Sequence, residues 1–309
     1  MKVVRAHEFG GPEVLKYEDI SMPEPSQGEI RIRVIAAGVN PMDWKARQGA
    51  LKLPLPLVMG IDVAGTVDVL GPEVKAFKAG DHVFAKVSLG QGGYAEYTVT
   101  NPSQAALMPK SIGFIEAAAV PTAGLAAWQS LFDIAGLEKG QSVLIHGAAG
   151  GVGSFAVQFA KWKGARVIGT ASRGNAEFLK SIGADVVIDY KAQQFEKVVH
   201  DLDVVLDTIG GDTFERSWGV LRPGGFLVTT VASVSKGAAE AHGVRAKSML
   251  TRADGSELAQ IAAVIDERHI KPIVTTVLPL SLARNAQEMS ESGHTRGKIV
   301  LRVAEDPQR

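Results

Sequence analysis

The chain has 309 residues, about twice the commonest domain size, and 46% of them are hydrophobic, so we expect two folded domains rather than a disordered chain. The 33 Lys and Arg residues balance 33 Asp and Glu residues, which leaves no excess of positive charge for a dedicated nucleic-acid-binding protein. Cysteine is absent, which excludes disulfides, cysteine-ligated metal sites and thiol nucleophiles.

Short β-rich runs, separated by Gly and Pro, make up the first part of the chain. They lie at residues 3–6, 29–37, 62–70, 82–85 and 94–99. The cleanest alternation of apolar and polar residues is Ile30, Ile32 and Val34 with two arginines between them. Such spacing predicts a β-barrel or sandwich.

From about residue 117 the pattern changes to strands that alternate with helices. Strands are predicted at 142–146, 166–169, 186–189, 204–206 and 226–231, most of them separated by a helix-length segment. This βαβ series predicts an α/β domain with a doubly wound parallel sheet, covered on both faces.

The last segments return the chain to the first domain. A capping-box-like start at Asp254 predicts a helix, and strands are expected at 273–277 and 298–303. We therefore place a β domain at residues 1–117, an α/β domain at 118–268 and the returning segment at 269–309.

The most informative segment joins a predicted strand to an amphipathic helix and reads AAGGVG over 148–153. Gly150 lets a pyrophosphate approach the backbone, and Gly153 lets the helix pack closely on the strand. The N–H groups at the N-terminus of the helix offer the anion a partial positive charge. Ala148 replaces the first glycine of the G-x-G-x-x-G fingerprint, yet the βαβ context supports a dinucleotide-binding loop over a glycine-rich turn without a ligand.

The end of the next strand indicates which dinucleotide binds. A site for NAD places an Asp or Glu about 20 residues after the loop, on the ribose hydroxyls, but this chain has Ser172 and Arg173 there. A guanidinium group can pair with a 2′-phosphate. We therefore expect NADPH, the alternative being an ordinary surface arginine.

Seven stretches in order along the chain carry a resemblance to a known family. They are AAGVNPMD at 36–43, GIDVAG at 60–65, GGYAEY at 92–97, TAGLAAW at 122–128, the loop at 147–153, IDY at 188–190 and GK at 297–298. As a set they resemble the zinc-free quinone oxidoreductases, the zeta-crystallin-like branch of the medium-chain dehydrogenase/reductase superfamily. The resemblance implies a GroES-like β-barrel domain with an inserted Rossmann domain.

Zinc-dependent relatives carry a Cys near the position of Asn40 and a His-Glu pair near Ile61 and Asp62. Asn and Ile cannot replace a thiolate and an imidazole as zinc ligands, so no metal is expected. The seven histidines form no metal-ligand spacing, and we expect them at the surface or in turns. The resemblance then implies metal-free hydride transfer from NADPH to a quinone or to a conjugated C=C bond.

The resemblance also implies the cofactor contacts. It places Asn40 and Thr122 near the nicotinamide, Gly151 and Val152 at the pyrophosphate, and Ser172, Arg173 and Tyr190 at the adenosine phosphate, with Val231 and Lys298 as further candidates.

Catalytic and substrate-binding candidates lie on two segments. Asn40 is expected to hydrogen-bond the substrate carbonyl, unless it is only a turn residue before Pro41. Asp43 is a candidate proton relay or a helix N-cap. The further substrate-pocket candidates are Trp44, Arg47, Met249 and Leu250.

Two other functions remain open at this point. One is an NADPH-binding redox sensor or structural protein with incidental turnover, and the other is an enoyl-thioester reductase that uses Arg245 and Lys247 for a carrier arm. The family habit favours a homodimer. No apolar run approaches the roughly 18 residues of a membrane span, and no signal peptide is recognised, so we expect a cytoplasmic protein with no membrane partner.

Overall fold

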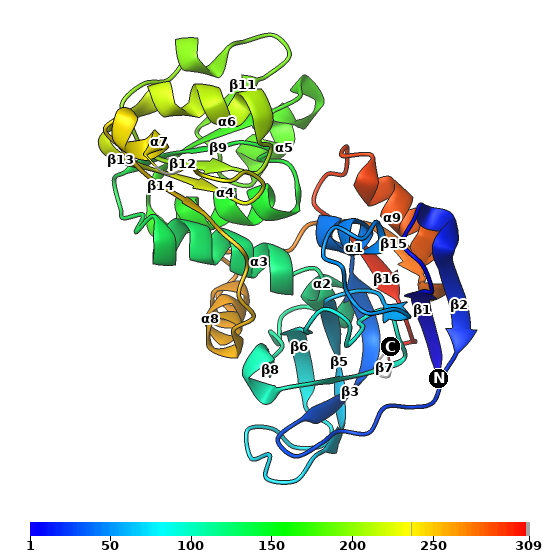
Figure 1. The fold of residues 1–309 in the computed structure, drawn as a ribbon. Coiled ribbons are helices and arrows are strands. Elements are labelled where there is room, and N and C mark those ends of the chain that lie inside the picture. Colours follow the sequence, from blue (N-terminus) through cyan, green and yellow to red (C-terminus); the bar gives the residue numbers. More distant parts are fainter. Residues whose placement is uncertain (236, 307–309) are drawn as a thin grey trace. The chain divides into compact units, whose positions relative to one another are not determined.

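The computed structural model describes residues 1–235 and 237–306, which form two compact units. The first unit contains Met1–Leu125 and the segment that starts at Ala253, and the second contains Ala126–Arg252. The C-terminal segment thus returns to the first unit, as the sequence predicts (Figure 1).

The first unit contains two β-sheets. A three-stranded sheet has the order β2-β1-β4, and a seven-stranded sheet has the order β15-β16-β3-β5-β6-β8 with β7 paired to β3. The strands are β1 (Lys2–Ala6), β2 (Leu15–Asp19), β3 (Ile30–Gly38), β4 (Leu57–Val58), β5 (Asp62–Leu70), β6 (His82–Lys86), β7 (Tyr97–Thr100), β8 (Ala105–Leu107), β15 (Val274–Pro279) and β16 (Lys298–Arg302). Because β16 pairs antiparallel with β3, Lys298 comes to lie near the residues that follow β3.

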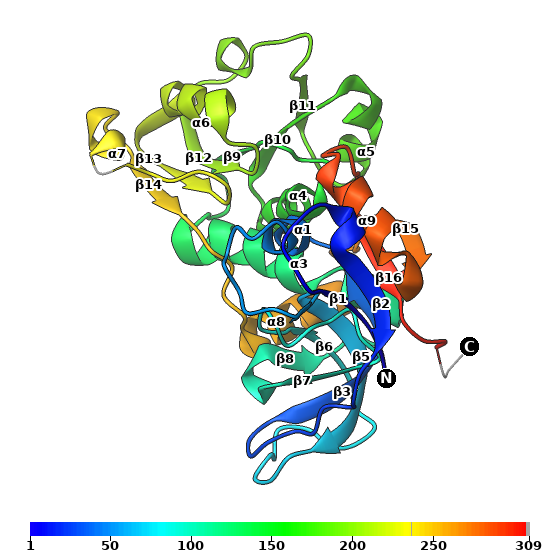
Figure 2. The same ribbon diagram turned by 45° about the vertical axis from the view of Figure 1, so that its right-hand side comes forward.

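Short helices close the first unit around these sheets. They are α1 (Pro41–Arg47), α2 (Phe114–Ala118), α8 (Gly255–Asp266) and α9 (Ala283–Glu291), and α3 (Pro121–Trp128) begins in this unit. In the second view, α9 lies beside β15 and β16, with which it is in contact (Figure 2).

The second unit is a six-stranded parallel sheet of order β11-β10-β9-β12-β13-β14. This is the doubly wound Rossmann order, which reverses between β9 and β12, so the α/β prediction is confirmed. The strands are β9 (Ser142–Ile145), β10 (Arg166–Ala171), β11 (Val186–Asp189), β12 (Leu202–Asp207), β13 (Leu221–Thr229) and β14 (Arg245–Ser248). The helices are α4 (Gly151–Lys163), α5 (Ala176–Ser181), α6 (Gly211–Ser217) and α7 (Ala238–Ala241).

Helix α4 follows the glycine-rich loop and packs against β9 and β10. Phe155 and Phe159 stand one turn apart on its buried face, and their rings stack at 5.9 Å. Burial of each ring contributes about 1.5–3 kcal/mol. The helix ends at Gly164, whose φ of +86° is a left-handed conformation that suits glycine.

Both domain boundaries differ from those expected. The units divide at Leu125/Ala126 and at Arg252/Ala253, whereas the sequence suggested 117/118 and 268/269. Helix α8 accounts for the second difference, because its apolar face is buried in the first unit, where it contacts β8. A helical pattern shows which face of a helix is buried but not which sheet it covers.

Candidate active site

The glycine-rich loop of the second unit runs from the end of β9 to the start of α4. Gly150 is the N-cap of α4, and no side chain caps this helix. A Cβ on Gly153 would collide with the carbonyl oxygen of Gly147 and lie 2.6 Å from the Cα of Ala148, so the close approach requires glycine. The helix N-terminus therefore offers backbone N–H groups to an anion, and this geometry fits a pyrophosphate.

Ala148 departs from the usual fingerprint, and its packing explains why the loop tolerates it. Its methyl group is buried against Gly169 of β10, where a Cβ would come within 2.9 Å of it. Gly169, on the neighbouring strand, thus leaves the space that the methyl group of Ala148 needs. A short sequence pattern does not contain this compensation.

The ends of β10 and β11 carry the residues expected at the adenosine phosphate. These parallel neighbours pair Ala171 with Asp189, so Ser172, Arg173 and Tyr190 follow adjacent strand ends. Arg173 is exposed and, among the residues that the structure describes, its side chain forms no ion pair or hydrogen bond. Tyr190 is 56% exposed. No carboxylate stands at the end of β10, so this edge fits a 2′-phosphate better than a bare ribose.

A buried carboxylate that the sequence reasoning missed organises the neighbouring loops. Asp207 ends β12, and its Oδ1 accepts hydrogen bonds from the N–H groups of Ile209 and Gly210, both at 2.9 Å. Its Oδ2 accepts a hydrogen bond from Thr229 Oγ1 at 2.8 Å. Thr229 Oγ1 in turn accepts a hydrogen bond from the N–H of Val231 at 3.3 Å. The loops after β12 and β13 are therefore fixed through one side chain.

His146 lies in a turn, as expected of the histidines, but it is buried and not at the surface. It follows β9, is 1% exposed, and its ring nitrogens lie 3.1 Å from Thr170 Oγ1 and 3.1 Å from Ser217 Oγ. Burial lowers the pKa of His146 to about 4, so the ring is neutral at pH 7.

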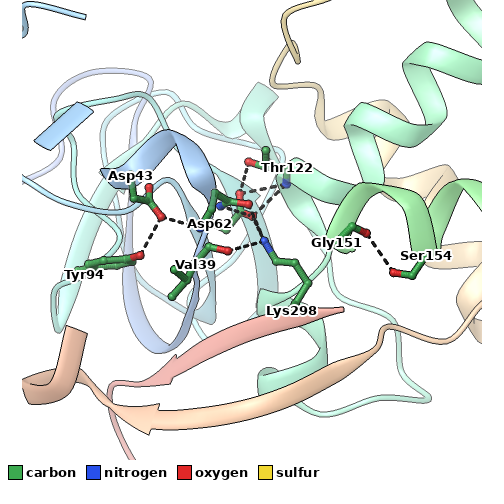
Figure 3. A network of polar contacts seen from close by, with 9 residues as sticks. Val39, Asp43, Asp62, Tyr94, Thr122, Gly151, Ser154 and Lys298 are labelled. Carbon is green, nitrogen blue, oxygen red and sulfur yellow. Dashed lines mark hydrogen bonds and ion pairs between the residues drawn. The ribbon is translucent and has the colours of Figure 1, made fainter. Parts of the chain in front are cut away.

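In the first unit a buried polar network brings together three of the predicted residues, Asn40, Thr122 and Lys298. Lys298 Nζ donates to Asn40 Oδ1 at 2.5 Å and to the carbonyl of Val39 at 2.8 Å. Asn40 Nδ2 donates to Asp62 Oδ2 at 2.9 Å, and Thr122 Oγ1 donates to Asp62 Oδ1 at 2.5 Å. Figure 3 shows Val39, Asp62, Thr122 and Lys298 converging.

Asp62 is the centre of this network, and the sequence identified it only as a position where zinc relatives carry a ligand. Its side chain is fully buried, and its oxygens also accept from the backbone N–H of Thr122 at 3.0 and 3.1 Å. A carboxylate at the first turn of α3 is favoured by the helix dipole. The ammonium of Lys298 lies 3.9 Å from Asp62 Oδ2, so the buried negative charge faces a positive one.

Asp43 is connected to this network through the backbone of Asn40. Its Oδ2 accepts from the Asn40 N–H at 2.8 Å and from the Tyr94 hydroxyl at 2.8 Å, whereas no group within residues 1–235 and 237–306 hydrogen-bonds its buried Oδ1 (Figure 3). Burial raises the pKa of Asp43 to about 7. Burial and the charge of Asp43 also raise the pKa of Tyr94 well above its ordinary value.

The substrate-pocket candidates, unlike Asn40, Thr122 and Lys298, do not form one hydrogen-bonded network. Arg47 is fully buried and donates to Gln287 Oε1 at 2.9 Å and to Glu291 Oε2 at 2.8 Å, which ties α1 to α9. The indole N–H of Trp44 is buried and has no partner among the described residues. Met249 is buried and follows β14, a sixth strand beyond the five that the sequence predicts, whereas Leu250 is 82% exposed.

Within the described residues no cluster of three His, Asp or Glu side chains is placed to hold a metal ion. In that same part of the chain, no helix is long and apolar enough to cross a membrane.

Comparison with known families and proteins finds dehydrogenase family models and reductase relatives over almost the whole chain. Residues 26–110 match the alcohol dehydrogenase GroES-like domain, and residues 182–301 match the zinc-binding dehydrogenase family. The 2-methylene-furan-3-one reductase of Solanum lycopersicum is 35% identical over 97% of this chain and 79% of its own length. The chloroplastic NADPH-dependent alkenal/one oxidoreductase of Arabidopsis thaliana is 36% identical over the same shares.

Solved structures agree with these matches. The quinone oxidoreductase of Coxiella burnetii superposes with a TM-score of 0.92 at 36% identity, over 98% of this chain and 99% of that one. The quinone oxidoreductase of Escherichia coli complexed with NADPH superposes with a TM-score of 0.91 at 30% identity, over 98% of this chain and all of that one.

Proposed function

The chain belongs to the zinc-free quinone oxidoreductase branch of the medium-chain dehydrogenase/reductase superfamily, and from this premise we propose that it reduces quinones or the C=C bond of small α,β-unsaturated carbonyls with NADPH. The names of its relatives, among them a furanone reductase, an alkenal/one oxidoreductase and quinone oxidoreductases, support this reaction. The observation that carries the choice of cofactor is the uncapped N-terminus of α4 together with Arg173, at a strand end that lacks an acid.

We assign each group of residues a task in this reaction. Gly151 and Val152 offer backbone N–H groups to the pyrophosphate, Gly150 lets it approach the backbone, and Gly153 keeps the helix close to the strand. Ser172, Arg173 and Tyr190 bind the 2′-phosphate, and the exposed Val231 covers part of the dinucleotide. When bound, NADPH supplies the hydride, which goes to an electrophilic carbon of the acceptor.

Asn40 and Thr122 act on the reacting end of the cofactor and on the acceptor. Asn40 Nδ2 has two hydrogens and donates one to Asp62, so one remains for an acceptor carbonyl. Such a donor stabilises the negative charge that develops on the carbonyl oxygen as the hydride arrives. We assign Arg47 to the packing of α1 against α9, and keep Trp44, Met249 and Leu250 as candidates for the acceptor pocket.

Replacement of Arg173 tests the cofactor assignment. We expect Arg173→Ala to weaken NADPH binding by about 10- to 100-fold, the worth of charge-assisted hydrogen bonds, and to leave NADH binding unchanged. Arg166→Ala is the matched control, because Arg166 is an exposed arginine at the opposite end of β10. An equal NADPH-to-NADH preference in the two variants would contradict the assignment.

Loss of the near-ultraviolet absorbance of NADPH with a panel of acceptors tests the reaction. We expect turnover with quinones and enones, and no loss of activity with a chelator. Tight NADPH binding without turnover would favour the redox sensor, and turnover restricted to enoyl thioesters would favour a carrier-bound substrate at Arg245 and Lys247. Inactivation by the chelator would overturn metal-free hydride transfer.

We further propose that the protein is a cytoplasmic homodimer. Strands β11 and β14 are the edges of the parallel sheet, and the family habit is a dimer through the edge of this sheet. Sedimentation of the purified protein tests the dimer, and microscopy of the tagged full chain tests its location.

A further inference from the structure

We propose that Lys298 is a positioning residue whose ammonium group fixes the direction of the hydrogen bonds that run from Lys298 to Asn40 and on to Asp62. This inference rests on the proposed function, because it concerns what Asn40 and Thr122 offer to NADPH and the acceptor. It differs from the expectation that Lys298 itself contacts the cofactor.

The direction follows from the chemistry of the two charged ends. An ammonium group only donates, so the oxygen of the Asn40 amide must face Lys298. A carboxylate only accepts, so the Asn40 nitrogen must face Asp62. The side-chain amide of an asparagine between two neutral partners can adopt either of two orientations. Here the ammonium group and the carboxylate each permit only one orientation of the Asn40 amide.

The same argument fixes the Thr122 hydroxyl. Its proton is donated to Asp62 Oδ1, so Thr122 Oγ1 has only lone pairs left for a ligand. Asn40 offers the opposite, a remaining N–H donor. The site therefore presents one acceptor and one donor, which suits an N–H group of a carboxamide at Thr122 and a carbonyl oxygen at Asn40.

The partners of the Lys298 ammonium group argue against a direct contact with NADPH. Its Nζ donates to Val39 O and Asn40 Oδ1 and lies 3.9 Å from Asp62 Oδ2, so its charge faces groups of the protein itself. Burial lowers the pKa of Lys298, while the nearby Asp62 and Asp43 act against this shift. Lys298 thus acts through Asn40 rather than on a ligand.

Lys86 provides a matched control on a neighbouring strand. It pairs with Asp62 in the register of β5 and β6, and the charge of Asp62 acts on it, but within the described part of the chain it does not hydrogen-bond Asn40. Lys86→Met therefore removes a positive charge near Asp62 without removing the donor to the amide.

The experiment compares Lys298→Met, Lys298→Gln and Lys86→Met in the full chain, by steady-state kinetics and by fluorescence titration of NADPH. We expect Lys298→Met to lower kcat by about 10- to 100-fold, the worth of a hydrogen bond to a charged group, while the Kd of NADPH stays within about threefold. Lys298→Gln keeps a donor without the charge, so we expect it to recover most of kcat. Lys86→Met should stay within about threefold of the unchanged protein in both quantities.

A readout on the protein without cofactor separates this proposal from the proposed function. We expect the side-chain amide signals of Asn40 in ¹⁵N NMR spectra, assigned with Asn40→Asp, to shift in Lys298→Met and to stay near their original positions in Lys298→Gln and Lys86→Met. Absence of NADPH binding in the unchanged protein would reject the proposed function alone. Three results would overturn the role of Lys298: an unmoved Asn40 signal, a Kd that rises in step with the loss of kcat, or equal losses in Lys298→Met and Lys86→Met. Lys298→Ala, which also removes the donor, carries the test with the same expected losses if Lys298→Met does not fold.

Discussion

Asp43 shows how one residue can resemble a catalytic group and yet be explained by local structure. It is the third residue of α1, and its Oδ2 accepts from the backbone N–H of the N-cap residue Asn40. The same oxygen accepts from Tyr94, which lies 51 positions away in the sequence. These bonds fix the start of α1 and with it the backbone of Asn40. The N-cap residue is therefore Asn40 and not Asp43, which completes a capping box from the third helical position. The geometry supports this structural role over the proton relay, which remains a prediction.

Asp43→Asn separates the two roles by pH. The folded protein keeps the Asp43 proton up to a pKa of about 7, while the unfolded chain loses it near 3.8, so this group makes the free energy of unfolding fall between about pH 4 and 7. The pKa difference corresponds to at most about 4 kcal/mol. Asn keeps the oxygen that accepts both bonds, so we expect the variant to gain stability relative to the unchanged protein as the pH rises, and to keep its kcat.

Urea unfolding at several pH values between 4.5 and 7.5 gives the difference in unfolding free energy between the variant and the unchanged protein, in which titrating groups that do not interact with Asp43 cancel. Tyr94→Phe is the control, because it removes a donor to Asp43 and keeps the carboxyl group. A constant difference across this range would contradict the raised pKa, and a large loss of kcat in Asp43→Asn would support the proton relay.

Asp207 fixes loops at the carboxyl ends of the parallel strands. This side chain joins the loop after β12 to Thr229 at the end of β13. Thr208 in the same loop donates to the carbonyl of His146 at 2.8 Å, which connects it to the loop after β9. Asp207 therefore connects two loops of the proposed dinucleotide site, and Thr208 connects these to the loop after the neighbouring strand β9.

We expect Asp207→Asn to weaken NADPH binding by about tenfold and to destabilise the fold by about 1–3 kcal/mol, because the amide cannot accept from Thr229 and from the loop N–H groups together. Asp203→Asn is the matched control. Asp203 lies near the opposite end of β12, where it accepts from Ser142 and pairs with Arg222. It should reduce stability but not NADPH affinity, as measured by urea unfolding and fluorescence titration. Equal losses of NADPH affinity in the two variants would contradict a specific role of Asp207.

The sequence predicts those features of the fold and of the candidate site that short stretches of the chain encode. The β9–loop–α4 unit, the exposed Arg173 and the return of β16 to the first unit all follow from short patterns and are present in the structure. The partners of Asn40 and Arg47 do not follow, since Lys298 lies 258 positions from Asn40 and Glu291 lies 244 positions from Arg47. Such pairs depend on how strands and helices from the two ends of the chain meet, which periodicity does not contain.

The proposed cofactor residues belong to both units, which gives a prediction for the entire protein. We expect saturating NADPH to slow backbone hydrogen exchange at the start of α4 in the second unit, and also at the starts of α1 and α3 in the first unit, because a bound ligand stabilises the elements that it contacts. At 100 times the Kd the stabilisation amounts to about 2.7 kcal/mol.

Exchange measured by mass spectrometry on peptides from each element tests this expectation. Peptides from β2, in the three-stranded sheet of the first unit, are the internal control and should not change. NADH at the same concentration should give weaker protection at α4, because it lacks the phosphate that we assign to Arg173. Protection confined to the second unit would show that Asn40 and Thr122 do not contact the cofactor, and would leave the assignment of the phosphate loop intact.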